Sequence, residues 1–321
     1  MRILITGVSG FAGSHLADDL LSPPTPAGEV WGCDRSGARK PFHPPALKML
    51  AADLLDPAAA RHVVATVQPD RIYHLVGQAH VGESWANPWA TLETNLRAQL
   101  NLFEAVLAAK LEPHILVLGS MEEYGRVSAD ELPIKETHPL RPDSPYGVSK
   151  VGQDMLGLQY HLSRNLPIVR VRPFNHIGPR QAHKFVAPAF ASQIAAIEAG
   201  RQAPVLNVGN LNARRDFTDV RDMVRAYVLA LEHGEPGEVY NIGSGRSHSV
   251  RELLEALLSC SDAPIQVETN TALLRPSDVP DVVCDSTRLR TRTGWAPRIP
   301  FEHSLRDLLD YERQRVEELS A

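Results

Sequence analysis

Three glycines, spaced three residues apart, follow the first apolar run of the chain. The run covers residues 3–5, and Gly7, Gly10 and Gly13 come next, at the start of a helix-like segment. A glycine-rich turn between a strand and a helix presents free backbone N–H groups at the positive end of the helix dipole, where an anion is stabilised. Gly7 permits the tight turn, Gly10 lets a pyrophosphate approach the backbone, and Gly13 allows close helix–strand packing. The pattern predicts a dinucleotide site and makes a purely structural turn the weaker alternative.

Strand-like and helix-like segments alternate through the first half of the chain. Apolar runs that each precede a turn and an amphipathic stretch span residues 3–5, 30–33, 72–75, 115–118 and 168–171. Such alternation is typical of a parallel sheet with helices on both faces. Helical spacing of apolar residues predicts helices over 89–109, 146–162 and 220–231. We therefore expect an α/β protein: a doubly wound parallel (Rossmann) sheet with a smaller, mixed α/β substrate-binding lobe.

The pattern loosens beyond Arg172, where prolines become frequent and the apolar runs shorten. Helices are expected over 190–199 and 250–258, with short strands over 205–208 and 239–242. We assign residues 1–172 and 212–247 to the dinucleotide-binding domain. Residues 173–211 and 248–321 are assigned to the substrate-binding lobe.

Charge and cysteine content exclude several classes of protein. The 321 residues include 33 basic and 38 acidic side chains, a net charge of −5, so no strong field attracts nucleic acid or anionic lipid. Cys33, Cys260 and Cys284 lie too far apart for a zinc motif or a disulfide framework. No apolar run approaches the roughly 20 residues that span a bilayer, and the first apolar run is too short for a signal peptide. We expect a cytoplasmic protein without a metal, a nucleic-acid partner or a membrane contact.

Charged residues after the second predicted strand bear on the choice of coenzyme. Asp34 lies about 20 residues beyond the glycines, where a carboxylate accepts the ribose hydroxyls of NAD(H). Arg35, together with Arg39 and Lys40, could instead hold the 2′-phosphate of NADPH, or these residues could be ordinary solvated charges. The sequence therefore predicts NADPH or NADH and does not choose between them.

Tyr146 and Lys150 lie four residues apart at the start of a predicted helix. Ser144 is a good N-cap and Pro145 a good first helical residue, so the tyrosine and the lysine share one helix face. A nearby ammonium can lower the pKa of a phenol, which is near 10 when unperturbed, and so assist proton transfer. Ser120 follows the fifth predicted strand, at the edge where α/β sheets bind ligands. We predict that Ser120, Tyr146 and Lys150 form a catalytic set. The alternative is that Tyr146 and Lys150 are simply two neighbouring residues on the exposed face of a helix.

These motifs resemble the extended short-chain dehydrogenase/reductase family, whose members mostly act on nucleotide-linked sugars. The likeness runs from residue 1 to about residue 311. Within the family, residues 119–125, 172–179, 215–220 and 275–279 are most similar to the reductases of GDP-4-keto-6-deoxy-D-mannose. The resemblance implies a nicotinamide coenzyme, a nucleotide-diphosphate sugar as substrate and a homodimer formed through the two longest helices.

The resemblance also implies roles for individual residues. The coenzyme would deliver hydride to the C4 keto carbon while Tyr146 protonates the oxygen, Ser120 hydrogen-bonds to it and Lys150 holds the tyrosine and the ribose. The residues implied to bind the coenzyme are Gly7, Ser9, Gly10, Phe11, Ala12, Gly13, Asp34, Arg35, Asp53, Leu54, Leu75, Val76, Gly77, Tyr146, Lys150 and Pro173. Asp53 could equally be an ordinary turn residue.

The residues implied to bind the sugar nucleotide are Ser120, Glu122, Asn175, Lys184, Arg215, Arg275 and Asp278. The planar fork of an arginine suits a diphosphate, although a surface ion pair is the alternative for each arginine and a solvated loop for Lys184. His80 and His176 lack a paired carboxylate, so we expect structural histidines there.

Glu122 carries the main alternative function. A carboxylate two residues after the serine resembles the C5 base of sugar-nucleotide dehydratases such as GDP-mannose 4,6-dehydratase. Met121 argues against this, because dehydratases generally have a polar residue here and a thioether cannot transfer a proton. A non-catalytic dinucleotide sensor is disfavoured because a sensor needs no proton relay. We therefore expect reduction of GDP-4-keto-6-deoxy-D-mannose to GDP-D-rhamnose, with Glu122 beside the hexose. The sequence leaves open which nucleotide base and which hexose stereochemistry the substrate has.

Overall fold

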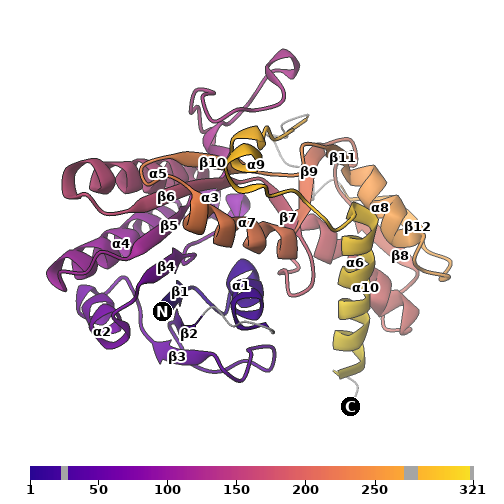
Figure 1. Cartoon of the computed structure of the whole chain (residues 1–321). Helices are drawn as coiled ribbons and strands as arrows, with labels where there is room; N and C mark the ends of the chain where they lie inside the picture. Colours follow the sequence, from indigo (N-terminus) through magenta and orange to yellow (C-terminus); the bar gives the residue numbers. More distant parts are fainter. Residues whose placement is uncertain (23–27, 271–280, 319–321) are drawn as a thin grey trace.

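The computed structural model describes residues 1–22, 28–270 and 281–318 of the chain. Its centre is a seven-stranded sheet in the order β3-β2-β1-β4-β5-β6-β10 (Figure 1), and neighbouring strands are parallel throughout. The predicted doubly wound parallel sheet is therefore confirmed. The strands are β1 (Arg2–Thr6), β2 (Glu29–Asp34), β3 (Lys48–Ala51), β4 (Arg71–His74), β5 (His114–Leu118), β6 (Ile168–Pro173) and β10 (Val239–Ile242).

Helices cover both faces of this sheet because alternate strand residues point to opposite sides. Ile3 and Ile5 pack against the layer of α1 and α7, whereas Leu4 packs against the layer of α2, α4 and α5. Burial on both faces explains why the strands are continuous apolar runs. No helix within the described ranges is long and apolar enough to cross a membrane. The helices are α1 (Phe11–Leu21), α2 (Pro57–Val67), α3 (Val81–Ala86), α4 (Pro88–Ala108), α5 (Pro145–Arg164) and α7 (Val220–His233), with short 3₁₀ turns η1 (Met121–Glu123) and η2 (Ala129–Glu131).

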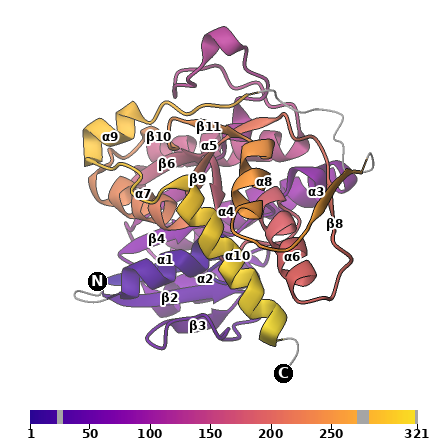
Figure 2. The same cartoon turned by 90° about the vertical axis from the view of Figure 1, so that its right-hand side faces the viewer.

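A smaller mixed α/β lobe lies beside the large sheet (Figures 1 and 2). It contains a three-stranded sheet in the order β11-β9-β7 and a two-stranded sheet of β12 and β8. Three helices pack together around a separate apolar core that includes Phe190, Leu253 and Leu308. Its elements are β7 (Asn175–Ile177), α6 (Val186–Glu198), β8 (Val205–Val208), β9 (Arg214–Asp219), β11 (Ser247–Ser249), α8 (Val250–Leu258), β12 (Gln266–Thr269) and α10 (Phe301–Glu318).

The chain passes between the two parts more often than the sequence suggests. Strand β9 lies inside the range 212–247 assigned to the dinucleotide-binding domain, yet it pairs with β7 and β11 in the small sheet. Conversely, α9 (Thr287–Thr293) contributes Leu289 to the core of the large sheet, and Trp295 follows it there. The division at these boundaries stays a prediction.

Candidate active site

The glycine turn forms a cradle that side chains would fill. Gly7 has φ +72°, and a Cβ added there would lie 2.9 Å from Val76 Cα. A Cβ at Gly13 would lie 2.4 Å from the carbonyl oxygen of Gly7. Helix α1 begins at Phe11 after Gly10, which has no side chain to cap the first N–H groups. An anion such as a pyrophosphate fits these free donors.

The loops after β1 and β4 meet beside this cradle. β1 lies between β2 and β4, so the connections leave it in opposite directions, which is where open α/β sheets bind ligands. Thr6 and His74 are paired across the strands, and Thr6 Oγ1 lies 3.0 Å from His74 Nδ1. Burial and the positive charge of Lys150 lower the pKa of His74 to about 3, so this histidine is neutral. The predicted contact residues Leu75, Val76 and Gly77 follow directly.

Asp34 ends β2 with its carboxylate held by the local loop. Its Oδ1 accepts the backbone N–H of Gly37 at 2.6 Å, and its Oδ2 accepts the hydroxyl of Ser9. Burial acts to raise the pKa of Asp34, but these hydrogen bonds outweigh it and hold the pKa below its ordinary value. Arg35 is exposed and forms no ion pair with any described residue, whereas Arg39 donates to two loop carbonyls. Arg35 is therefore the available cation beside Asp34.

Three further predicted coenzyme contacts lie at the ends of β3 and β6. The carboxylate of Asp53 accepts the N–H of Leu55 at 3.0 Å, the arrangement of an ordinary turn residue. Leu54 packs in the apolar core beneath the sheet. Pro173 is the last residue of β6. A contact of these residues with the coenzyme stays a prediction.

Helix α5 brings Tyr146 and Lys150 into the interior. Ser144 caps the helix, with its Oγ accepting the N–H of Gly147 at 3.0 Å, and Pro145 is its first residue, as predicted. Tyr146 is 8% exposed and Lys150 7% exposed. The Lys150 ammonium donates to the carbonyl of Leu118 at 2.9 Å and to Gln153 Oε1 at 2.8 Å. Burial lowers the pKa of Lys150 to about 8.

The pKa of Tyr146 is raised, whereas the sequence predicted that Lys150 would lower it. Lys150 Nζ lies 5.9 Å from the centre of the tyrosine ring, because its hydrogen bonds direct it to the end of β5. Burial raises the pKa of Tyr146, and a hydrogen bond with Ser120 opposes that rise. The phenol therefore keeps its proton at neutral pH, which is the state of a proton donor.

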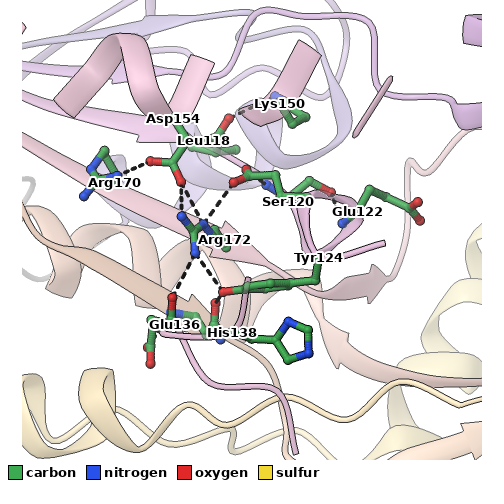
Figure 3. Close-up of polar contacts among 12 residues, drawn as sticks. Leu118, Ser120, Glu122, Tyr124, Glu136, His138, Lys150, Asp154, Arg170 and Arg172 are labelled. Atoms are coloured by element: carbon green, nitrogen blue, oxygen red, sulfur yellow. Dashed lines mark hydrogen bonds and ion pairs between the residues drawn. The ribbon is translucent and has the colours of Figure 1, made fainter. Parts of the chain in front are cut away.

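Ser120 caps the turn η1 that follows β5. Its Oγ accepts the N–H of Glu122 at 3.2 Å. The Met121 side chain packs into an apolar cluster with Tyr124 and Phe174. Glu122 is half-buried, and its carboxylate points away from the charged groups around Arg172 (Figure 3). Ser120 and Glu122 thus flank Tyr146, whose pKa both of them influence.

A cavity of about 370 Å³ in the small lobe contains three predicted substrate residues. They are Asn175, Lys184 and Arg215, which come from β7, the following loop and β9. Asn175 Oδ1 is buried and has no hydrogen-bond partner among the described residues, so it marks a polar contact for a ligand. Lys184 forms an ion pair of 3.3 Å with Glu83. Arg275 and Asp278 lie outside the described residues.

His80 and His176 make structural contacts. The ring of His176 stacks on Phe11, with 5.5 Å between the centroids, and burial lowers its pKa. His80 caps α3, since its Nδ1 accepts the N–H of Glu83 at 3.2 Å. The stacked pair places the wall of the cavity, which includes His176, next to the glycine turn.

Comparison with known proteins decides the family. The family model described as GDP-mannose 4,6 dehydratase matches residues 4–308. The chain belongs to the GDP-mannose 4,6-dehydratase family. This family lies within the extended short-chain dehydrogenases/reductases, so the predicted resemblance is confirmed. The chain is 36% identical to GDP-6-deoxy-D-mannose reductase of Pseudomonas aeruginosa, over 99% of both chains, and 30% identical to human GDP-mannose 4,6 dehydratase, over 98% of this chain and 92% of the human one.

A solved structure agrees with this family assignment. The structure of RMD from Pseudomonas aeruginosa complexed with NADPH superposes with a TM-score of 0.85 at 34% identity. It covers 98% of this chain and 100% of that protein. The two proteins therefore share one fold over nearly the whole of both chains.

Sequence reasoning missed a group of buried charges under the site. Glu123, Asp154, Arg170 and Arg172 are each at most 5% exposed. Burial and the neighbouring Asp154 raise the pKa of Glu123, whereas Arg172 opposes the rise. Two signals in the sequence pointed to this group: Glu123 lies three residues after Ser120, the spacing of a capping box, and Asp154 lies four residues after Lys150 on the same helix.

Proposed function

We propose that this protein reduces the C4 keto group of a nucleotide-linked 6-deoxy-4-ketohexose, converting GDP-4-keto-6-deoxy-D-mannose to GDP-D-rhamnose with NADPH or NADH. The observation that carries the proposal is the joint placement of Ser120, Tyr146 and Lys150 at the carboxyl edge of the sheet, next to the glycine cradle. The 36% identity with a full-length GDP-6-deoxy-D-mannose reductase supports it.

The cradle fits a nicotinamide dinucleotide. The N–H groups at the start of α1 suit its pyrophosphate, and Asp34 or Arg35 would meet the adenosine ribose or its 2′-phosphate. Bound in reduced form, such a coenzyme supplies a hydride. The structures of relatives in complex with NADPH and with NAD support this class of coenzyme.

The residues of the chain supply the proton and the electrostatics. Tyr146 keeps its proton at neutral pH and donates it to the oxygen as negative charge develops there. The hydroxyl of Ser120 hydrogen-bonds to the same oxygen and so lowers the energy of the charged state. Lys150, with its pKa lowered to about 8, places a positive charge beneath the phenol that stabilises the phenolate left behind.

The position of Met121 favours reduction over dehydration. A dehydratase must remove the C5 proton and also protonate the leaving C6 hydroxyl. Glu122 could serve as the base, but the Met121 side chain packs among apolar residues and carries no transferable proton. We therefore assign Glu122 to the hexose pocket of a reductase. The 30% identity with GDP-mannose 4,6 dehydratase keeps the dehydratase as the second candidate.

The cavity in the small lobe is the proposed nucleotide site. Arg215 supplies a planar cation for a diphosphate, and the unpartnered Asn175 Oδ1 accepts a hydroxyl or amine of the ligand. Lys184, Arg275 and Asp278 belong to the same proposal, the last two on sequence similarity.

Offering both substrates tests the proposal. With GDP-4-keto-6-deoxymannose, a reductase consumes one equivalent of NADPH or NADH per product, measured as loss of nicotinamide absorbance. With GDP-mannose, a dehydratase forms the 4-keto sugar without net loss of reduced coenzyme. Glu122→Gln is expected to retain most of the reductase activity but would abolish a dehydratase. A sensor would turn over neither substrate, which would contradict the proposal.

The same proposal includes a homodimer in the cytoplasm. The face shared by α4 and α5 carries exposed apolar side chains, among them Trp89 at 73% and Leu100 at 40% exposure. A groove of about 520 Å³ runs between the helices, and Gly152 allows them to approach closely at Leu96. Such a face can bury itself against its own copy about a twofold axis. Leu100→Glu should give a monomer in light scattering, whereas the exposed Leu162→Glu on the far end of α5 serves as the control.

A further inference from the structure

Four buried ionisable side chains gather at the turn that carries Ser120; Figure 3 labels three of them, Asp154, Arg170 and Arg172. The set consists of Glu123, Asp154, Arg170 and Arg172, two acidic side chains paired with two guanidinium groups. Buried ions are costly unless they are paired with good geometry, and such pairs often add little to stability. A contribution to stability therefore does not by itself explain why these four side chains are buried together.

One end of the set holds the backbone of Ser120. Glu123 Oε1 accepts the N–H of Ser120 at 2.7 Å, and its Oε2 lies 3.0 Å from Arg172 Nε. A Cβ on Gly119 would come within 2.1 Å of that Oε1, so only glycine leaves room for the carboxylate. Arg172 attracts Glu123 as an ion-pair partner, and Glu123 in turn accepts the Ser120 N–H, so the position of Ser120 is coupled to that of Arg172.

The other end of the set holds helix α5. Asp154 lies one turn after Lys150, and its Oδ2 is 2.5 Å from Arg172 Nη2. Arg172 Nη1 also donates to the hydroxyl of Tyr124 at 3.0 Å. Arg172 Nε also donates to Asp154 Oδ2, at 2.7 Å, so the planar guanidinium makes several directed contacts at once, which a lysine could not. Arg172 connects the serine turn to the helix that carries Tyr146.

We propose that Glu123, Arg172 and Asp154, here called the brace, are positioning residues that set Ser120 against Tyr146. The inference rests on the proposed function, in which both hydroxyls must meet one substrate oxygen. None of the three touches that oxygen; they act through the backbone of Ser120. Misplacement of a catalytic group by about 1 Å can cost about 100-fold in rate, so the brace affects turnover more than coenzyme binding.

Asp154→Asn tests the brace from its far end, because Asp154 does not touch Ser120. Asp222→Asn is the matched control: Asp222, on α7, is also a buried carboxylate paired with an arginine, Arg225, and its other oxygen accepts two N–H groups of the segment 298–299. We expect Asp154→Asn to lower kcat about 10- to 100-fold with an unchanged dissociation constant for the coenzyme. Asp222→Asn should lower the melting temperature without lowering kcat. Equal effects of the two variants on kcat would overturn the proposal.

A double-mutant cycle separates positioning from general stability. In a Ser120→Ala background, Asp154→Asn should lower kcat by much less than in the wild type, because the brace acts through Ser120. Additive losses would show that Asp154 acts independently of Ser120. If Asp154→Asn does not fold, Glu123→Gln replaces it in the cycle, since an amide oxygen can still accept the Ser120 N–H while the charge is lost.

Amide hydrogen exchange tests the brace without turnover. By NMR, the Ser120 N–H should exchange at least about 10-fold faster in Asp154→Asn than in Asp222→Asn or the wild type. Absence of turnover in the wild type, together with this faster exchange, would refute the proposed function and keep the brace. Unchanged exchange would refute the brace whatever the activity.

Discussion

Replacing Lys150 by methionine should change how the stability of the protein depends on pH. The pKa of Lys150 lies at about 8, below its ordinary value of 10.5, because burial disfavours the ammonium. Between these two values the unfolded protein binds more protons than the folded one, so the stability of the wild type rises with pH in that window. Below about pH 8 the folded protein bears the full cost of the buried charge. The methionine variant has no charge here and should lack this rise.

The size of the effect follows from the shift. At about 1.4 kcal/mol per pKa unit, it corresponds to about 3 kcal/mol in total, and about 2–3 kcal/mol of this falls between about pH 7 and pH 10. The variant also loses the hydrogen bonds to Leu118 and Gln153. This loss changes its free energy of unfolding by the same amount at every pH and leaves the slope against pH unchanged. Urea unfolding at several pH values measures both profiles.

The matched control for this experiment is Lys135→Met, which removes an exposed lysine. Its stability should follow the wild type at every pH. Parallel profiles for wild type and Lys150→Met would show that the ammonium is not destabilised by burial. The assignment of a pKa of about 8 to Lys150 would then be wrong.

Further predictions concern the chemistry and the two ligands. Tyr146→Phe should lower kcat about 10³-fold while coenzyme affinity, measured by calorimetry, stays within about twofold, because only the transferable proton is lost; parallel losses would contradict the assigned role. Arg215→Ala should raise the KM for the sugar nucleotide about 10- to 100-fold, since a charge-assisted phosphate contact contributes about 1.5–3 kcal/mol. An unchanged KM would remove Arg215 from the site. Arg35→Gln should weaken binding of 2′-phospho-ADP-ribose about 10-fold and leave binding of ADP-ribose unchanged. If the variant binds 2′-phospho-ADP-ribose as tightly as the wild type, Arg35 does not contact a 2′-phosphate.

Local features of the site could be predicted because local physics determines them. Gly7 has a positive φ and Gly13 no room for a Cβ, as the spacing of the glycines indicated. The N-cap Ser144 and Pro145 begin α5 where capping preferences place a helix start. The expected helix over 89–109 is observed as α4 (Pro88–Ala108). Hydrogen bonds and apolar periodicity over a few residues suffice for such predictions.

The contacts between distant segments could not be predicted in this way. Arg172 meets Glu123 across 49 positions, and its role depends on β6 passing beneath the turn after β5. The direction of Lys150 Nζ toward the carbonyl of Leu118 likewise follows from the packing of α5 on that strand. Burial of the phenol, which also depends on this packing, raises the pKa of Tyr146, contrary to the expectation from the helical spacing.

The sequence by itself determined the alternation of strands and helices, the glycine cradle and the start of the helix that carries Tyr146 and Lys150. Only the tertiary structure decided that Met121 packs among apolar residues, that β9 joins the small sheet and that Arg172 pairs with both Glu123 and Asp154. The physical reason is that capping and periodicity act over a few residues. Burial and charge pairing, in contrast, depend on which distant segments the packed chain brings together.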